Sequence, residues 1–487
     1  MTIGSTTLRE KPAGASLTSL SSARAFVTIG CASKGALNTP TPTGQPSDTT
    51  GSFGCGPAVR AHVYKQTATG AQGIFLRVKA TARAAIVSPV DVASWSGTSV
   101  PTVTASSPTD GYDVRVKFPT GGTVGTTGAF YAISLDGGRT YGTATALGTA
   151  NTIAIGTTGL TLNLATGTIV TNDEVAFYVI PASGALLPRT ITRAASSTAT
   201  LTASGTPQDA YDVRLEWLTA CTVGTAGGTY RYSLDGGRTF TPDTPLGTNN
   251  SITILDGGED SGIAIALGAG TLDKGDTLTF GTTAPEFQVS DALTALAALR
   301  TSKFSWSWIH VAQALDTSTA GSLGTAVAAW ATKAKYSFLI ADARPATAYE
   351  KASNWIARLV AQWSGVADTR IGLGAGMARI TDPTTGRRVR RPVGWLAATR
   401  IITTAPHRDI AEKAAGALSS DVTIHDETGA LVEHDAYEDN TLDTARFICL
   451  RQYPDEAGVY FASGSVMGPA NDIQRLADRR VLNAVAE

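Results

Sequence analysis

The feature that most constrains the fold of this chain is an internal duplication. The stretch 111–116 (GYDVRV) aligns with 210–215 (AYDVRL), and 131–141 (YAISLDGGRTY) aligns with 230–240 (YRYSLDGGRTF). Both copies are rich in Gly and Thr and consist of short strand-length runs separated by regular turn signals. This pattern predicts two tandem all-β, sandwich-like domains.

The two copies differ in length at one place. The offset between equivalent residues is 99 from Tyr112 and Tyr211 to Ile153 and Ile252, and it becomes 103 by Gly159 and Gly262. The second copy has therefore gained a loop of four residues. We place the first copy at 97–184 and the second at 185–284.

The segments on either side of the duplication show a different order of predicted strands and helices. After Pro285 helical and strand patterns alternate, which predicts a mostly parallel or mixed sheet covered on both faces. Before the duplication the chain reads as strand, loop, helix and strand, which is an incomplete unit of the same kind. We therefore expect an α+β multidomain fold, in which an α/β core (24–96 and 285–487) is interrupted by the two β domains. Strands are expected at 25–29, 74–78, 305–311, 337–341 and 369–374, and helices from residue 57 and at 291–300, 322–335 and 348–363.

The stretch 446–481 predicts a docking surface. Two short strands, 447–450 and 459–463, are followed by a helix that Asn471 can cap. On this helix Ile473, Leu476, Ala477 and Val481 recur at helical spacing, and three arginines crowd one end. These arginines are candidate contacts to an acidic partner: Arg475, Arg479 and Arg480.

The composition excludes several classes of function. Lys plus Arg is 39 and Asp plus Glu is 40, so the net charge of −1 gives no general attraction to nucleic acid or an anionic membrane. The four cysteines have neither metal-binding nor redox spacing and are expected to be free buried thiols. No apolar run reaches membrane-spanning length and the N-terminus has no signal-peptide core, so we expect a soluble chain made in the cytosol.

The sequence offers turns rather than catalytic sites. Ser134–Tyr141 and Ser233–Phe240 match the Asp-box pattern of sialidase-type propellers, a tight hairpin in which Asp binds turn amides and Gly takes positive φ. We read these as structural turns, built on Asp136, Gly138, Asp235 and Gly237.

No other motif predicts catalysis or a cofactor. Gly372, Gly374 and Gly376 follow a strand but lack the spacing and the helix of a dinucleotide fingerprint. No set of residues has the context of a nucleophilic site or a metal site, so no catalytic residue, cofactor or metal is expected. The basic run 387–391 (RRVRR) is an exposed hairpin arm or a site for an acidic protein partner, with nucleic acid third because no aromatic residues interleave.

The outer parts of the chain resemble contractile tail sheath proteins of phage tails and related injection systems. The resemblance lies in 26–30 (FVTIG) with 32–40 (ASKGALNTP), in 53–57 (FGCGP), in 457–461 (AGVYF) and in 476–481 (LADRRV). It implies a non-enzymatic subunit that forms homo-hexameric rings stacked around a tail tube, with baseplate and tail terminator proteins as further partners. It implies a place in the virion tail, assembled in the host cytoplasm, with no nucleic-acid binding and no membrane insertion. The arginines of the last helix would then face the tube.

The same resemblance implies extended arms that link neighbouring subunits. Residues 1–23 would form the N-terminal arm, with these linker candidates: Thr2, Ile3, Leu8, Leu17 and Leu20. Family members usually continue beyond the last helix, whereas this sequence stops at Glu487. The C-terminal arm is therefore absent, supplied by another chain, or missing from this sequence.

Two other classes stay open at this point. The Asp-box turns also suit a secreted carbohydrate-binding or glycosidase-like protein, which should have a signal peptide and paired carboxylates. A capsid or other shell protein would also be β-rich and self-associating.

Overall fold

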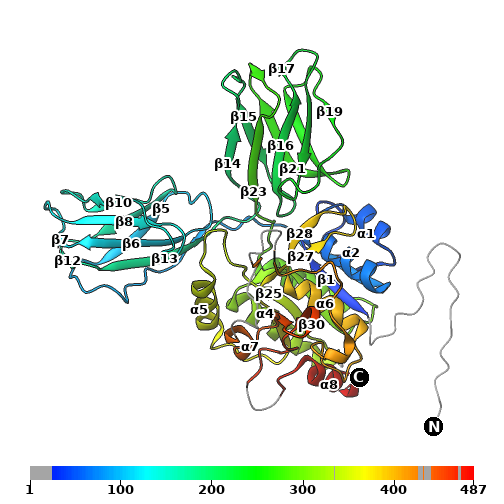
Figure 1. Ribbon diagram of the computed structural model, residues 1–487. Helices are drawn as coiled ribbons and strands as arrows, with labels where there is room; N and C mark the ends of the chain where they lie inside the picture. Colours follow the sequence, from blue (N-terminus) through cyan, green and yellow to red (C-terminus); the bar gives the residue numbers. More distant parts are fainter. Residues whose placement is uncertain (1–24, 334, 426–430, 433–439, 470–472, 487) are drawn as a thin grey trace, which may run out of the picture.

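The computed structural model describes residues 25–333, 335–425, 431–432, 440–469 and 473–486. A mixed α/β core carries two all-β units that project from it, the first drawn in cyan and the second in green (Figure 1). The expected combination of an α/β core with β-rich parts in the middle of the chain is confirmed.

The core is built on a sheet of six strands. Their order is β2-β3-β1-β24-β25-β26, and all pairs are parallel except that of the edge strand β2 with β3. β1 lies inside the sheet and joins β24, with Phe26 opposite Trp308. Sheet pairing therefore connects residues more than 200 positions apart. The strands are β1 (Phe26–Gly30), β2 (Thr41–Thr43), β3 (Gly73–Arg77), β24 (Trp308–Leu315), β25 (Leu339–Ala343) and β26 (Ile371–Gly374).

Helices cover both faces of this sheet. On one face α3 (Val289–Thr301), α4 (Thr317–Ala328) and α5 (Ala352–Trp363) share a core with alternate strand residues such as Val27 and Ile309. On the other face α2 (Pro57–Thr69) and α6 (Val393–Thr403) cover residues such as Phe26 and Trp308. Because both faces are covered, all five residues of β1 are buried, as expected for a central parallel strand.

Three helices were not predicted. α1 (Pro46–Phe53) falls in a stretch read as a loop, α6 in a stretch read only as apolar, and the single-turn α7 (Thr441–Thr444) in a stretch for which no element was predicted. The sequence of α1, PSDTTGSF, has low helix propensity. The helix buries Thr49 and Phe53, so tertiary packing overrides the local preference.

The end of the chain also differs from the prediction. Ile448 hydrogen-bonds across to Leu373 and Ala375 and so extends the sheet beside β26, while the hairpin strands are β29 (Leu450–Tyr453) and β30 (Glu456–Phe461). The last helix, α8 (Leu476–Ala486), begins later than expected, and Asn471 lies outside the described residues. The remaining elements of the core are β27 (Met377–Thr381), β28 (Arg388–Pro392), α7 (Thr441–Thr444), and the 3₁₀ turns Ala329–Lys333 and Lys413–Ala415.

The two β units have the same strand order. Each has a five-stranded, a three-stranded and a two-stranded sheet: β4-β13-β6-β8-β9, β10-β11-β5 and β12-β7 in the first, and β14-β23-β16-β18-β19, β20-β21-β15 and β17-β22 in the second. An apolar core fills each unit. The first unit comprises β4 (Ile86–Val87), β5 (Pro101–Ala105), β6 (Asp113–Thr120), β7 (Gly122–Thr123), β8 (Phe130–Ser134), β9 (Thr145–Ala146), β10 (Thr152–Ala154), β11 (Leu160–Leu164), β12 (Thr168–Ile169) and β13 (Glu174–Ile180). The second comprises β14 (Leu186–Thr192), β15 (Leu201–Gly205), β16 (Asp212–Thr219), β17 (Cys221–Thr222), β18 (Thr229–Ser233), β19 (Thr244–Pro245), β20 (Ser251–Asp256), β21 (Glu259–Leu267), β22 (Thr271–Leu272) and β23 (Thr277–Thr282).

The connections between core and units meet at one place. The amide of Thr81 donates to the carbonyl of Glu286 (2.8 Å), and the amide of Ser183 donates to the carbonyl of Arg83 (3.0 Å). The chain thus leaves the core and returns to it at adjacent points. The first unit begins at Ile86 rather than at residue 97, because the two-residue strand β4, in a stretch with Pro89 nearby, gives little sequence signal.

Candidate functional site: the interfaces that dock the β units

The described residues contain no candidate for metal chemistry. No group of three or more His, Cys, Asp or Glu side chains among them is placed to hold a metal ion. The four cysteines, of which Cys221 alone is partly exposed, are all free thiols. In the same part of the chain, no helix combines the length and the hydropathy needed to cross a membrane.

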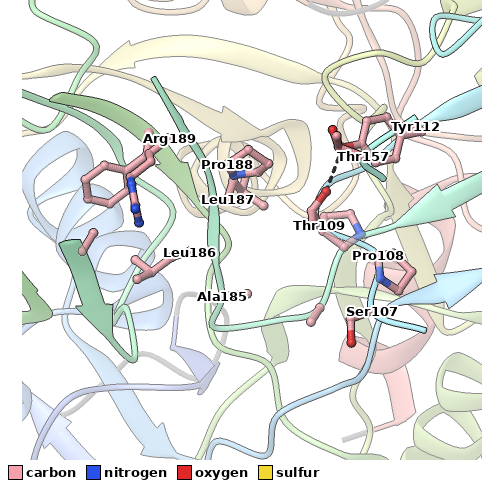
Figure 2. Close-up of a pocket in the computed structure, with 14 residues that line it drawn as sticks. Ser107, Pro108, Thr109, Tyr112, Thr157, Ala185, Leu186, Leu187, Pro188 and Arg189 are labelled. Carbon is pink, nitrogen blue, oxygen red and sulfur yellow. Dashed lines mark hydrogen bonds between the residues drawn. The ribbon is translucent and has the colours of Figure 1, made fainter. Parts of the chain in front are cut away.

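A cleft of about 500 Å³ lies between the two β units (Figure 2). One side is formed by β14, with Leu186, Leu187 and Arg189, and the other by the loop that contains Thr109 and Tyr112, whose hydroxyls hydrogen-bond to each other (2.9 Å). Among the residues that line it there is no carboxylate, histidine or thiol. The hydroxyls in this lining therefore have no carboxylate, imidazole or thiolate beside them in the lining to activate them as nucleophiles.

The Asp-box turns have the geometry of structural hairpins. In the first, the Asp136 carboxylate accepts hydrogen bonds from the hydroxyl (2.6 Å) and the amide (3.0 Å) of Thr140, and chiefly the hydroxyl contact lowers its pKa to about 2. Gly138 has a φ of 86°. In the second, Asp235 accepts from the hydroxyl (2.8 Å) and the amide (2.9 Å) of Thr239, and Gly237 has a φ of 96°.

The first β unit docks on the start of α5. Asp113, fully buried, accepts from the guanidinium of Arg358 (2.7 Å) and from the side-chain amide of Asn354 (2.8 Å). The Asp-box turn takes part, because Arg139 donates to the backbone carbonyl of Glu350 (3.0 Å). Arg358 also pairs with the carboxylate of Glu350 (2.8 Å). At the centre of this interface the carboxylate of Asp113 binds the basic Arg358 and the polar Asn354 of α5.

The second β unit docks through a different set of acidic residues. Asp209 receives two hydrogen bonds from Arg391 (3.0 and 2.7 Å). Asp256 lies between Arg60 (2.7 Å) and Arg387 (2.8 Å). Burial alone would raise the pKa of Asp256, but the two guanidinium groups outweigh it and hold the pKa below its usual value. Because these pairs are buried, loss of one partner would leave an uncompensated charge, which typically costs about 3–5 kcal/mol.

The four extra residues of the second copy form part of this interface. They lie where β20 and β21 meet, in a hairpin whose tip carries Asp256 and Glu259. Glu259 pairs with Lys34 of the core (2.7 Å). The corresponding strands of the first unit, β10 and β11, are shorter. The length difference seen in the sequence thus supplies a contact to the core.

The basic run 387–391 is not a free hairpin arm. Arg387 and Arg391 bind Asp256 and Asp209, and Arg388 donates to the backbone carbonyl of Asp421. The acidic groups that bind Arg387 and Arg391 thus belong to the second β unit of the same chain.

The three arginines of the last helix lie in different surroundings. Arg479 and Arg480 are each only 8% exposed. Arg480 donates to the carbonyls of Ile401 (3.2 Å), Thr404 (2.6 Å) and Ala405 (3.1 Å), and so caps the C-terminal end of α6. Arg479 donates to the side chains of Asn483 (3.0 Å) and Thr369 (3.3 Å), so both guanidinium groups are engaged inside the chain rather than presented to a tube. Only the side chain of Arg475 is about half exposed, with a long contact to Asp409 (3.6 Å).

The burial pattern of α8 explains this outcome. Leu476, Arg479, Arg480 and Asn483 face the core, whereas Val481 is exposed. The helical spacing of Ile473, Leu476, Ala477 and Val481 therefore does not mark the buried face of α8. The proposed linker residues Thr2, Ile3, Leu8, Leu17 and Leu20 lie outside the described residues.

A buried ionisable cluster was missed by the sequence analysis. Lys65 on α2 and His310 on β24 are both fully buried, with Nζ and Nδ1 2.7 Å apart. Burial lowers the pKa of both groups. Nearby, burial raises the pKa of Asp342 to about 8, against the effects of the Gly394 amide and Lys65. The only sequence signal is that Lys65 follows His62 by three residues, on the side of α2 that faces the sheet.

Comparison with known proteins places the chain in a family. A family model described as DUF2586, N-terminal domain, matches residues 12–465, which is most of the chain. The chain belongs to the DUF2586 family. None of the curated proteins compared with it matches this DUF2586 protein in sequence.

Solved structures similar to this DUF2586 protein include sheath proteins. A sheath tail protein from Desulfitobacterium hafniense is 10% identical, with a TM-score of 0.37, over 99% of this chain and 81% of that one. A sheath tail protein from Listeria innocua is 10% identical, with a TM-score of 0.34, over 95% and 74%. The helical sheath of the anti-feeding prophage in its contracted state is 14% identical, with a TM-score of 0.26, over 42% and 52%. With TM-scores below 0.5, these likenesses do not assign a function to this chain.

Proposed function

We propose that this protein is the sheath subunit of a contractile tail or of a related injection system. The observation that carries the proposal is the position of the sheath-like motifs. Those at 26–30 and 53–57 and those at 457–461 and 476–481 come from opposite ends of the chain, yet all belong to one core, in which β1 pairs with β24. The role is structural and non-enzymatic.

In this proposal copies of the chain form homo-hexameric rings that stack around a tail tube. The baseplate and the tail terminator would bound the stack, within a virion tail assembled in the host cytoplasm. Neither nucleic-acid binding nor membrane insertion is part of the role. Of the helix arginines, Arg475 is the one whose exposure suits a contact to the tube.

The proposed work of the sheath is a lattice transition. An extended lattice would convert to a shorter and wider one when a signal from the baseplate releases it, which makes each subunit a two-state element biased by its neighbours. A bias of only ~1 kcal/mol per subunit, summed over a lattice, is enough for an all-or-none change. No nucleotide is consumed in this scheme.

The two β units would decorate the outside of such a tube. Their matching strand orders and the repeated sequence support an origin by duplication of one inserted domain. The adjacent positions of Thr81 and Glu286 support insertion at a single point of the core. The buried ion pairs would hold the second unit in a fixed orientation during a transition.

Negative-stain microscopy of the purified full-length chain tests the proposal. Striated tubes, formed alone or on added tube protein, are the expected result. Closed shells would instead support a capsid-like protein, and persistent monomers that bind glycans would support the carbohydrate-binding alternative.

A second experiment concerns the arm. Deletion of residues 2–20 should leave a folded monomer that forms no long tubes, because strand addition between neighbouring copies would be lost. Tubes of normal length from the deleted chain would contradict the role of Thr2, Ile3, Leu8, Leu17 and Leu20 as linker residues.

A further inference from the structure

The same surface of the two β units lies in two different environments. Asp113 of the first unit corresponds to Asp212 of the second, and Gly137 corresponds to Gly236, at the offset of 99. In the first unit Asp113 and Gly137 are buried against the start of α5. In the second unit Asp212 and Gly236 are exposed. The surface that docks on the core in the first unit is therefore exposed at Asp212 and Gly236 in the second, where the guanidinium of Arg238 lies beside Gly236.

The turn itself does not need the carboxylate of Asp212. In both units the backbone closes the turn, with the amide of Gly137 or Gly236 donating to the carbonyl of Asp113 or Asp212 (2.8 Å in each). Within the described part of the chain, the Asp212 side chain has no hydrogen bond or ion pair, whereas that of Asp113 has an arginine and an asparagine. The fold of the second unit thus leaves the binding capacity of Asp212 unused.

The charge distribution indicates which partner would fit. Residues 97–284, which hold nearly all of the two β units, carry 15 acidic and 9 basic side chains, whereas the rest of the chain carries 25 acidic and 30 basic ones. The β units are therefore net negative and the rest of the chain is net positive. Within one chain both interfaces already follow this rule, since Asp113, Asp209 and Asp256 all bind arginines of the core.

We propose that the surface of the second β unit around Asp212 and Gly236 binds the basic core of a second copy of this chain. The contact would repeat between copies the chemistry that docks the first unit within a copy: a carboxylate received by guanidinium and amide groups. It would not use α5, because the Arg358 of every copy is occupied by its own Asp113. The inference rests on the proposed function, since it presupposes that copies assemble.

Charge reversal tests this contact on the full-length chain. Asp212→Arg should raise the protein concentration needed for tube formation by about tenfold, because an attractive pair becomes a repulsive one. Asp243→Arg is the matched control, since it makes the same change of charge at another exposed position of the second unit, and it should leave that concentration unchanged. Circular dichroism and thermal unfolding of both variants should match the wild type, because both sites lie on the surface.

The outcomes separate this inference from the proposed function. Failure of the wild type to assemble under any condition would overturn both. Normal assembly by Asp212→Arg, or an equal effect of both substitutions, would overturn the contact alone. An independent readout uses a photo-crosslinking amino acid at position 212, in a chain that still assembles into tubes. Irradiation of these tubes should join two copies of the chain. The peptide crosslinked to position 212 should come from residues 24–85 or 285–486 of the other copy. Crosslinks only within one chain, or to a β unit of the second copy, would also overturn the contact.

Discussion

At the scale of single residues, most of the arginines considered as contacts to partners stabilise this chain itself. Arg391 binds Asp209, Arg387 binds Asp256, and Arg480 caps α6. Burial lowers the pKa of Arg480 to about 10, so its side chain remains charged at neutral pH and can bind the carbonyls at the negative end of the helix dipole. Arginine in a dense basic run or at a helix end is therefore a poor guide to a partner when the chain has its own acidic units.

A pair of alanine substitutions separates the two kinds of arginine. Arg480→Ala should lower the free energy of unfolding by about 2 kcal/mol, because three backbone carbonyls lose a charged donor in a buried setting. Arg475→Ala should change it by less than about 0.5 kcal/mol, because the Asp409 contact is long and half exposed. Urea unfolding followed by circular dichroism measures both. Equal effects would show that burial of Arg480 adds no stability.

Histidine burial predicts a defined pH dependence. The ring of His62 lies between the hydroxyls of Thr28 (2.8 Å) and Thr43 (2.9 Å), and burial, with a smaller effect of Lys65, keeps its pKa well below 6.5. Below pH 6.5 the unfolded chain gains a proton at this position that the folded chain does not. Stability from His62 is therefore present above pH 6.5 and is lost as the pH falls.

The measurement compares the wild type with His62→Gln. Between pH 7 and pH 5.5 the wild type should lose about 1 kcal/mol more of its unfolding free energy than the variant does. Asp342 acts in the opposite sense, because its raised pKa of about 8 gives stability that is lost as the pH rises towards 8. That effect is common to both proteins and cancels in the difference. Parallel pH profiles would contradict a neutral buried His62.

At the scale of elements, one hairpin makes most of the ion pairs that hold the second unit, and Asp209 with Arg391 makes the other. The β20–β21 tip places Asp256 between Arg60 and Arg387, and Glu259 against Lys34. The first unit has the short version of this hairpin and uses Asp113 and its Asp-box turn instead. Two copies of one fold thus reach the same core through different loops and turns.

Shortening the tip to the length in the first unit should undock the second unit without unfolding it. Replacing Leu255–Gly262 by the sequence of Gly156–Gly159 removes Asp256 and Glu259 but keeps the strands that build the apolar core. Limited proteolysis should then cut the connections around 183–186 and 283–286 much faster, with the unit itself resistant. A matched control is the conservative change Glu259→Gln, which removes only an exposed pair and should leave the cleavage rate nearly unchanged. Unchanged cleavage in the shortened variant would contradict the docking role.

At the scale of the whole molecule, the core is one folding unit that the β units interrupt. The three strands before the interruption (β2-β3-β1) and the three after it (β24-β25-β26) form one continuous sheet joined at the β1–β24 pair, and residues from both parts share the apolar cores on its two faces. The β units have cores of their own, and their entry and exit points are adjacent. This arrangement lets a domain be added or removed with little effect on the host fold.

Excision of the first unit tests this view. Joining Arg83 to Gly184 by two glycines removes residues 84–183, and the gap is short because Arg83 and Ser183 share two hydrogen bonds. The remaining chain should unfold cooperatively and, under the proposed function, should still form tubes. Asn354→Ala and Arg358→Met in the excised chain would remove the polar groups that the excision exposes. If the excised chain lost cooperative unfolding both with and without these two substitutions, the view that the first unit is an inserted domain would be contradicted.

Much of this organisation could be predicted from the sequence. Several of its features are local sequence patterns, and such patterns report on local structure. They are the duplication, the four-residue difference between copies, the Asp-box turns and the alternation of strands and helices on either side of the duplication. The parallel sheet also followed, because strands and helices alternate at the spacing of βαβ units. Helix α1 could not be predicted from the sequence, because its polar residues become helical only where Phe53 and Thr49 are buried.

The sequence by itself determined the parts of this protein: two β units of one design, and a core divided between the two ends of the chain. The tertiary structure alone decided which surfaces are used. In the folded chain Asp256 pairs with Arg60 and Arg387. The arginines of α8 face inward and Val481 is exposed. Asp113 is buried, whereas its counterpart Asp212 is exposed. The physical reason is that a charged or apolar side chain acquires its role from the neighbour that removes it from water, and that neighbour is here often more than 100 residues away in the sequence.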